Sequence, residues 1–295
     1  MNGIIVINKE KGYTSHDVVA KLRGILHIKK IGHTGTLDPD ATGVLPVCIG
    51  NATKVCDLIM DRTKTYTAGV KLGLVTDTQD ISGQVLSEKA VKVSFEELTE
   101  ATKHFLGDIS QLTPMYSARK VNGQKLVDLA RKGITVSRET KRITVHAIDI
   151  LDFDEVDGTF SMRVVCSKGT YIRTLCNDIG DYLGCGACMT SLRRNASGEF
   201  TEEEALTLSM VEKLRDEGTL SERILSADKL FMDYGRAEIT EEGRSFLHNG
   251  NPLTPDKLCF TEENTERVRV YEDDVFTALY EFRDRLYWPV KMFLQ

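Results

Sequence analysis

The 295-residue sequence predicts an α+β fold: a mixed, largely antiparallel sheet flanked by helices, followed by a small β-rich C-terminal domain. Two observations predict it. Strand-like and helix-like segments mix along residues 1 to 198 without the regular alternation of a parallel βαβ fold. From about residue 234, short apolar runs alternate with charged turns, which is typical of a small β domain. Because one core rarely grows beyond roughly 250 to 300 residues, we expect two domains, residues 1–232 and 233–295.

Apolar or alternating runs predict the first strands, at Gly3 to Asn8, Val44 to Ile49 and Thr65 to Leu72. A helix is expected from Ser15 to Leu26, with Ser15 as its N-terminal cap and its apolar residues on one face. Another helix should begin at Ser94, because Ser94 and Glu97 form a capping-box pattern.

Later elements follow from the same signals. Strands are expected at Arg142 to Leu151 and Thr159 to Cys166, and helices at Gln124 to Arg131 and Tyr171 to Leu183, each helix stopped by a glycine. A capping box at Thr201 to Glu204 and a short acidic helix at Ser209 to Glu217 come next. The β-rich domain should contain strands at Val268 to Tyr271, Phe276 to Phe282 and Leu286 to Val290.

The formal net charge of -6 is unevenly distributed. Residues 199–295 hold 22 acidic and 12 basic side chains, so residues 1–198 carry a net charge of +4. Between Arg119 and Arg142 there are eight Lys or Arg and two acids. This segment is either a solvated helix face or a surface for a phosphate backbone, and the residues alone favour neither interpretation.

Seven cysteines spread over a long chain indicate reduced core residues rather than disulfides. Cys185 and Cys188 have CxxC spacing, but no second pair completes a tetrahedral zinc site, so we expect no metal. No 18-residue apolar run and no N-terminal signal segment are present, so we expect a soluble cytoplasmic protein that does not contact membranes.

The segment from Gly32 to Leu45 places one carboxylate, Asp38, in a glycine-rich loop just before an apolar strand. Glycine and proline permit a tight turn, so Asp38 is a candidate functional side chain. The loop contains Gly-Thr-Leu-Asp-Pro, and three further motifs accompany it: Lys-Thr-Tyr at 64–66, Leu-Gly-Leu-Val-Thr-Asp-Thr-Gln-Asp at 72–80, and Ser-Lys-Gly-Thr-Tyr-Ile-Arg-Thr at 167–174. Together they resemble the motifs of the TruB-type tRNA pseudouridine synthases.

The resemblance implies the pseudouridine synthase fold and a set of catalytic residues. Asp38 falls on the nucleophile of the family, and Arg173 falls on the arginine that pairs with it. Such a pair is chemically reasonable, because burial raises a carboxyl pKa and a neighbouring cation keeps the group ionised. Tyr66 falls on the tyrosine that stacks on the target uracil and is a candidate for removing the C5 proton. A phenol with a reference pKa of about 10 needs a tuned site for that step.

The resemblance also implies supporting roles. His33 falls on the histidine that holds the rearranged RNA loop, and Asp80 on the acid that orients the arginine. Tyr171 and Leu192 fall on the wall of the base pocket. Basic side chains are expected to contact phosphates, namely Lys54, Lys168 and the segment from Arg119 to Arg142.

Three positions depart from the family pattern. Glu10 and Thr113 stand where proline is usual, and we expect the change at Glu10 to loosen a turn without removing a catalytic group. Asp40 adds a carboxylate close to Asp38 and should point to solvent, because adjacent like charges raise one pKa. The segment from Gly250 to Leu253 is similar to part of a PUA-type RNA-binding module, so the C-terminal domain is expected to be PUA-like, although its acidic balance argues against strong RNA affinity.

The resemblance implies isomerisation of the T-loop uridine of tRNA, at the position conventionally numbered 55, by a monomer that needs no cofactor and no protein partner. Three alternatives stay open. Asp38, Asp40 and Thr42 fit the DxDxT pattern of magnesium-dependent aspartyl-phosphate phosphatases, although no apolar strand precedes them. The chain could be a tRNA-folding chaperone, or a guide-RNA-dependent relative within a ribonucleoprotein.

Overall fold

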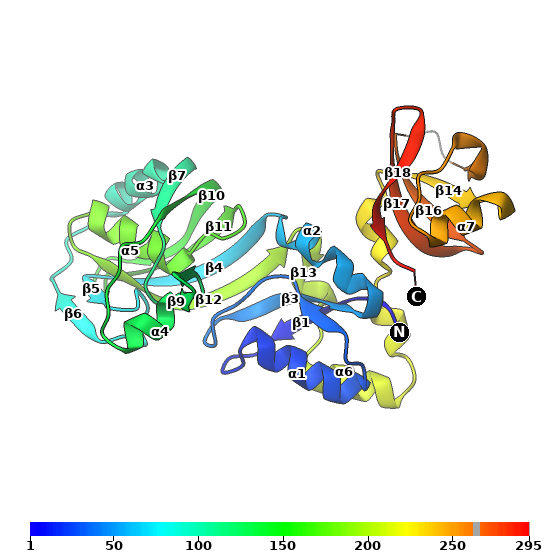
Figure 1. Ribbon diagram of the computed structural model, residues 1–295. Coiled ribbons are helices and arrows are strands. Elements are labelled where there is room, and N and C mark those ends of the chain that lie inside the picture. Colours follow the sequence, from blue (N-terminus) through cyan, green and yellow to red (C-terminus); the bar gives the residue numbers. More distant parts are fainter. Residues whose placement is uncertain (262–265, 295) are drawn as a thin grey trace.

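The computed structural model describes residues 1–261 and 266–294 and contains two principal sheets (Figure 1). Within these residues the larger sheet has nine strands, in the order β1-β3-β12-β4-β11-β10-β7, with β2 paired to β3 and β13 paired to β12. The strands are β1 (Gly3–Lys9), β2 (Ile31–His33), β3 (Thr42–Ile49), β4 (Lys64–Leu72), β7 (Gly107–Leu112), β10 (Thr140–Asp154), β11 (Thr159–Cys166), β12 (Ala187–Ser197) and β13 (Phe200–Thr201). Among the described pairs of this large sheet, β3 and β12 alone run parallel, so the predicted largely antiparallel α+β fold is confirmed.

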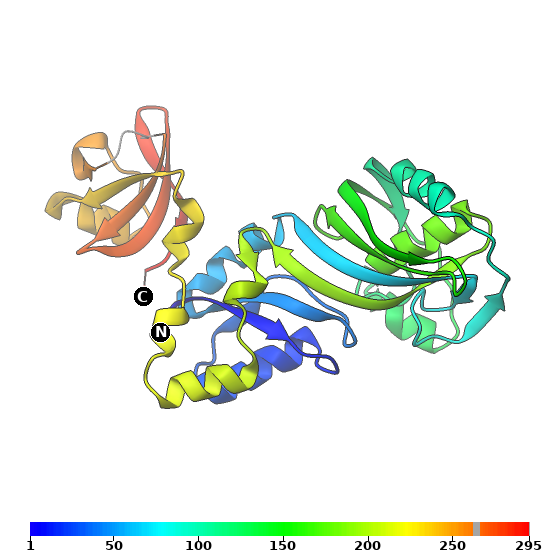
Figure 2. The same cartoon turned by 180° about the vertical axis from the view of Figure 1, so that it is seen from behind.

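Helices cover the large sheet in two groups. At the β1–β3 end, α1 (Ser15–Leu26) and α6 (Leu208–Asp216) bury Val18, Leu22 and Val211 against the strands. At the other end, α5 (Ile172–Tyr182) and α3 (Phe95–His104) enclose a second core around β4, β10 and β11. Strands β4 and β12 run through both halves of the sheet (Figures 1 and 2), and their buried apolar residues pack in the second core.

The helix starts follow the side chains that can cap them. The first helix spans Ser15 to Leu26 as predicted, but its cap is Thr14, and the expectation for Ser15 was wrong by one residue. The Thr14 hydroxyl accepts a hydrogen bond from the backbone N–H of Asp17, and the Asp17 carboxylate accepts one from the backbone N–H of Thr14. Ser15 is buried instead, and its hydroxyl accepts a hydrogen bond from the backbone N–H of Leu37. The predicted capping box of Ser94 and Glu97 is confirmed.

The predicted helix from Gln124 to Arg131 was too long. Gln124 and Lys125 form β9, which pairs with β8 (Lys120–Val121) around a turn at Asn122 and Gly123, both with positive φ. Asn-Gly favours such hairpin turns, and this signal competes with the helical pattern. The helix α4 therefore begins later, at Leu126–Arg131. The central strand β12 and several short strands were not predicted. Among the missed strands, β5 (Leu74–Thr76), β6 (Val85–Glu88) and β7 lack an apolar run or are exposed.

A second sheet follows from residue 235, in the order β15-β14-β16-β17-β18. Its strands are β14 (Gly235–Ile239), β15 (Leu258–Phe260), β16 (Arg267–Glu272), β17 (Val275–Arg283) and β18 (Leu286–Met292), and it carries the short helix α7 (Arg244–His248). It lies beside the end of the large sheet that holds β1 and β3, near the helix α2 (Cys56–Met60) and both chain termini (Figures 1 and 2). None of the described helices is long and apolar enough to span a membrane.

Candidate active site

The turn that carries Asp38 joins β2 to β3 and is held from several sides. Ser15 in α1 accepts a hydrogen bond from the Leu37 backbone at 2.9 Å. The Lys9 ammonium at the end of β1 donates to the carbonyls of Pro39 and Ala41, at 3.1 and 2.6 Å. These contacts fix the backbone on both sides of Asp38, while its own side chain stays 43% exposed. The result is a rigid turn that presents one accessible carboxylate.

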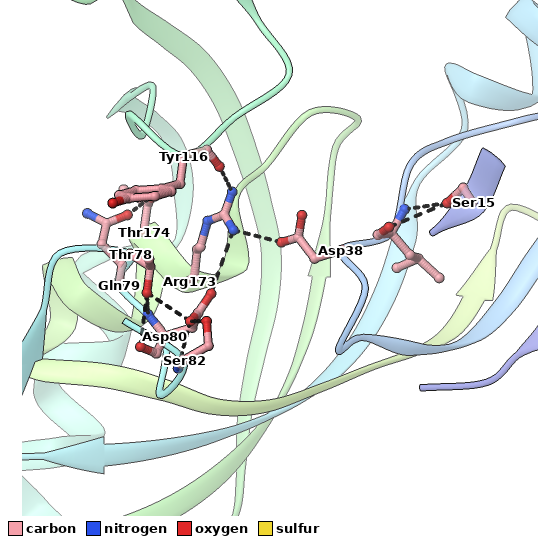
Figure 3. A network of polar contacts seen from close by, with 10 residues as sticks. Ser15, Asp38, Thr78, Gln79, Asp80, Ser82, Tyr116, Arg173 and Thr174 are labelled. Atoms are coloured by element: carbon pink, nitrogen blue, oxygen red, sulfur yellow. Dashed lines mark hydrogen bonds and ion pairs between the residues drawn. The ribbon is translucent and has the colours of Figure 1, made fainter. Parts of the chain in front are cut away.

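Arg173 pairs with that carboxylate, as Figure 3 shows. Its Nη1 lies 2.9 Å from Asp38 Oδ2 and 3.8 Å from Asp80 Oδ2, and its Nη2 donates to the Tyr116 carbonyl. Arg173 lies in the first turn of α5 and is 6% exposed, so the guanidinium is buried and bonded. The planar guanidinium can hold both carboxylates through charge-assisted contacts.

Asp80 is anchored by its own loop, after β5. Its Oδ1 accepts hydrogen bonds from the Thr78 hydroxyl and from the backbone and hydroxyl of Ser82, at 2.8, 3.0 and 2.5 Å. The other oxygen faces Arg173 (Figure 3). A fixed carboxylate of this kind can orient the arginine, which is the role the resemblance implies for Asp80.

Tyr66 in β4 is 9% exposed. It belongs to the core cluster that includes Leu37 and Ala41, which lie in the turn that carries Asp38. Burial raises the pKa of its phenol, and the Arg194 guanidinium opposes this rise. A raised pKa disfavours the phenolate that would remove a proton. A uracil that stacks on Tyr66 must also displace neighbouring side chains as it enters.

Two predicted wall residues lie close to the same core. Leu192 in β12 packs against the cluster that contains Tyr66. Tyr171 is the residue before α5, and its ring lies 5.9 Å from the guanidinium carbon of Arg173. The amide of Gln111 in β7 bonds both the N–H and the carbonyl of Tyr171, at 2.8 and 3.0 Å. Gln111 therefore fixes the start of α5 and, with it, Arg173.

His33 ends β2 and is half-buried. Its ring lies edge-on to His16 with 5.1 Å between centroids, and its Nδ1 accepts a hydrogen bond from the Gly35 backbone. Burial, and then the neighbouring His16, lower the pKa of His33. A neutral imidazole at neutral pH suits hydrogen bonding to a nucleotide better than ion pairing with a phosphate.

The predicted phosphate-binding residues already have protein partners. Lys54 is part-buried and donates to the Met292 carbonyl at 2.8 Å, which places it at the seam between the two sheets. Lys168 pairs with Asp61 at 2.5 Å. Within the basic segment, Arg119 pairs with Glu139 and Arg142 with Asp108. These exposed pairs are weak and can exchange for phosphates, whereas the bond of Lys54 is at a buried seam.

Sequence patterns missed four residues that support the site. Lys9, Gln111, Tyr116 and Arg194 are bonded to the backbone or side chains of the site, and all but Tyr116 are buried. Lys9 and Arg194 lie within strands. A charged residue inside a strand is the sequence signal that could have identified them. Asp40 points to solvent as expected, 4.0 Å from Lys11.

The comparisons with known proteins agree with this geometry. A model of the TruB family pseudouridylate synthase N-terminal domain matches residues 23–172, and one of the tRNA pseudouridylate synthase B C-terminal domain matches residues 173–232. The chain belongs to the TruB family. It is an isomerase of the pseudouridine synthase class, and the phosphatase and chaperone alternatives are not favoured.

Relatives of this TruB chain extend over its full length. It is 49% identical to the tRNA pseudouridine synthase B of Lachnoclostridium phytofermentans, covering 100% of both chains. It is 46% identical to that of Clostridium perfringens, covering 95% of this chain and 94% of the relative. A solved Cbf5-Nop10-Gar1 complex contains a chain with a TM-score of 0.73 and 26% identity, covering 99% of this chain and 85% of that one. The pseudouridine synthase fold is therefore confirmed.

Proposed function

We propose that this chain acts alone, as a monomer, to isomerise the T-loop uridine of tRNA at position 55 to pseudouridine. The observation that carries the proposal is the pair formed by the buried Arg173 and the accessible Asp38, 2.9 Å apart, beside the core that holds Tyr66. The full-length relatives named tRNA pseudouridine synthase B support tRNA as the substrate. Such a substrate would place the protein in the cytoplasm.

In the proposed reaction the bond between C1′ of the ribose and N1 of the uracil breaks, the base turns, and C1′ bonds to C5. The C5 proton leaves and N1 gains a proton, so composition is unchanged. Asp38 acts as the nucleophile, at C1′ or at C6, and Arg173 pairs with it and orients it. Asp80 fixes Arg173 in turn. No step needs a metal or another cofactor.

The target base must leave its stack to reach Asp38. Tyr66 offers a replacement stacking surface, worth about 1 to 3 kcal/mol per base, and Tyr171 and Leu192 complete the pocket wall. We assign Tyr66 to stacking first, since its buried phenol is a poor base. His33 contacts the displaced nucleotide from the catalytic turn. Lys168 and the Arg119 to Arg142 segment bind phosphates, with Lys54 contributing only if its bond to Met292 opens.

We further propose that residues 1–232 form the catalytic domain and residues 233–295 a PUA-like domain. The five-stranded sheet from residue 235 onward supports this division, as does the end of the family match at residue 232.

The test is incubation of the purified chain with an unmodified tRNA T-arm hairpin in EDTA, followed by mapping of pseudouridine. We expect conversion at one uridine by the wild type and none by Asp38→Asn, which still binds the hairpin. Asp40→Asn is the matched control, because Asp40 is two residues away, is exposed, and forms a long ion pair with Lys11 at 4.0 Å. Product formation by Asp38→Asn would refute the catalytic assignment, and a requirement for added proteins would favour the ribonucleoprotein alternative.

A further inference from the structure

Arg194 in β12 is the largest side chain that the described residues bury completely, with 1% of its surface exposed. None of the ion pairs between described residues includes it. Its hydrogen bonds go to backbone carbonyls: Nε donates to Val44 at 2.6 Å and Nη2 to Gly35 at 3.3 Å. A buried charge without a carboxylate partner is costlier than an apolar side chain of the same size, so filling space does not account for an arginine here.

The two carbonyls that Arg194 binds stand on either side of the catalytic turn. Gly35 lies three residues before Asp38, and Val44 lies six residues after it, in β3. Between them, Lys9 binds the carbonyls of Pro39 and Ala41. Two buried cations therefore hold the backbone of the turn at four carbonyls, while Arg173 holds its carboxylate.

Arg194 also meets the strand that carries the stacking tyrosine. In the sheet it is paired with Tyr66 of β4 on one side and with Gly43 of β3 on the other. Gly43 has φ of +101°, and a Cβ there would lie 2.3 Å from the Arg194 carbonyl, so the two backbones approach as only glycine allows. Burial raises the pKa of the Tyr66 phenol, and the positive charge of Arg194 acts to lower it. One residue thus joins the two functional elements.

We propose that Arg194 is a positioning residue of the isomerisation, which sets the turn bearing Asp38 relative to the strand bearing Tyr66. The inference rests on the proposed function. A misplacement of the reacting groups by about 1 Å can lower the rate about 10²-fold. Removal of the Arg194 contacts should therefore slow the chemical step. RNA affinity should change little, because Arg194 is buried and cannot reach a phosphate.

The experiment measures single-turnover rate constants and hairpin affinity for two variants. Arg194→Met removes the charge. Arg194→Lys keeps the charge but loses the planar set of guanidinium N–H donors. We expect a rate loss of about 10²-fold for Arg194→Met and a smaller loss, about 10-fold, for Arg194→Lys, with Kd within about threefold of wild type. Arg269→Met is the matched control. Arg269 is also a buried strand arginine, 3% exposed, and bonds the Tyr234 carbonyl in the second sheet. The Arg269→Met variant should have a lower Tm than the wild type and an unchanged rate constant.

Three results would overturn the inference while leaving the proposed function intact. The first is an active wild type together with an Arg194→Met variant of near-wild-type rate. The second is a loss of Arg194→Met confined to Kd. The third is an equal rate loss in an Arg269→Met variant of the same Tm. If circular dichroism shows that Arg194→Met does not fold, Arg194→Lys decides, and a rate within about twofold of wild type overturns the inference. An inactive wild type would instead refute the proposed function.

Discussion

At the scale of single residues, the site is built on buried cations that differ in their partners. Lys9, Lys64 and Arg194 bond backbone carbonyls, and each fixes the position of a chain segment. Arg173 instead faces the carboxylates of Asp38 and Asp80. The first three cations fix backbone geometry, whereas Arg173 orients the Asp38 carboxylate.

Lys64 allows this use of buried charge to be tested. Its ammonium donates to the carbonyls of Met60 and Arg62, both at 2.6 Å, and burial lowers its pKa from 10.5 to about 8. Between those pH values the unfolded chain binds a proton that the folded chain does not, so the contribution of Lys64 to the free energy of unfolding rises with pH. Relative to Lys64→Met, the wild type should gain about 2 kcal/mol between pH 7 and pH 9.5, measured by urea unfolding.

The same titration of Lys71→Met gives the control, since Lys71 lies in the same strand and is half-exposed. The pH dependence of the difference between Lys71→Met and the wild type is the baseline against which the gain of Lys64 is measured. A wild-type advantage over Lys64→Met that shrinks as pH rises would contradict the lowered pKa.

At the scale of elements, the sequence was most informative where one side-chain pattern acts locally. The strand Thr159–Cys166 and the helix Ser15–Leu26 have the predicted bounds, because alternation and apolar spacing determine them directly. The strand β7 has no such pattern and forms because β10 offers it an edge to pair with. Pairing of this kind depends on residues distant in the chain, so no local signal predicts it.

The site residues likewise fall into those that a local sequence motif predicts and those that depend on contacts with distant parts of the chain. The motifs located Asp38, Asp80 and Arg173, and the structure brings both carboxylates within ion-pair distance of Arg173. Gln111 could not be found, because its amide acts on the backbone of Tyr171, 60 residues away, and a backbone partner leaves no trace in the sequence. The contact of Lys54 could not be found for a similar reason, since its partner comes from β18, far along the chain.

Two glycines allow the role of backbone geometry in these elements to be measured. Gly43→Ala would place a Cβ 2.3 Å from the Arg194 carbonyl at φ of +101°, so β3 and β12 must separate. We expect this variant to lose at least about 2 kcal/mol of unfolding free energy and most of its activity. Gly24→Ala is the control: it lies in α1 with open space around it, and the change should stabilise the chain by up to about 1 kcal/mol. Equal unfolding free energies in the two variants would argue against the close approach of β3 and β12.

At the scale of the whole molecule, the two sheets share a core. Phe276, Leu279 and Phe293 from the second sheet and the chain after it pack in one cluster with Ile4 and Val44 of the first sheet. Polar contacts cross the same seam: Asn51 donates to the Phe293 carbonyl at 3.0 Å, and Lys291 pairs with Asp57 at 2.7 Å. A seam with an apolar centre favours unfolding of both parts as one unit.

Phe293→Ala tests whether that seam couples the two sheets. Phe293 is 6% exposed and stacks near Phe276, with 4.7 Å between ring centroids, so its truncation should cost about 3 to 5 kcal/mol where the sheets meet. Calorimetry should show one transition for the wild type and two for the variant, because each sheet keeps its own core. The matched control is Phe282→Ala, at an exposed position of β17 outside that shared cluster, which should keep one transition. Two transitions in the wild type would mean that the seam does not couple the sheets.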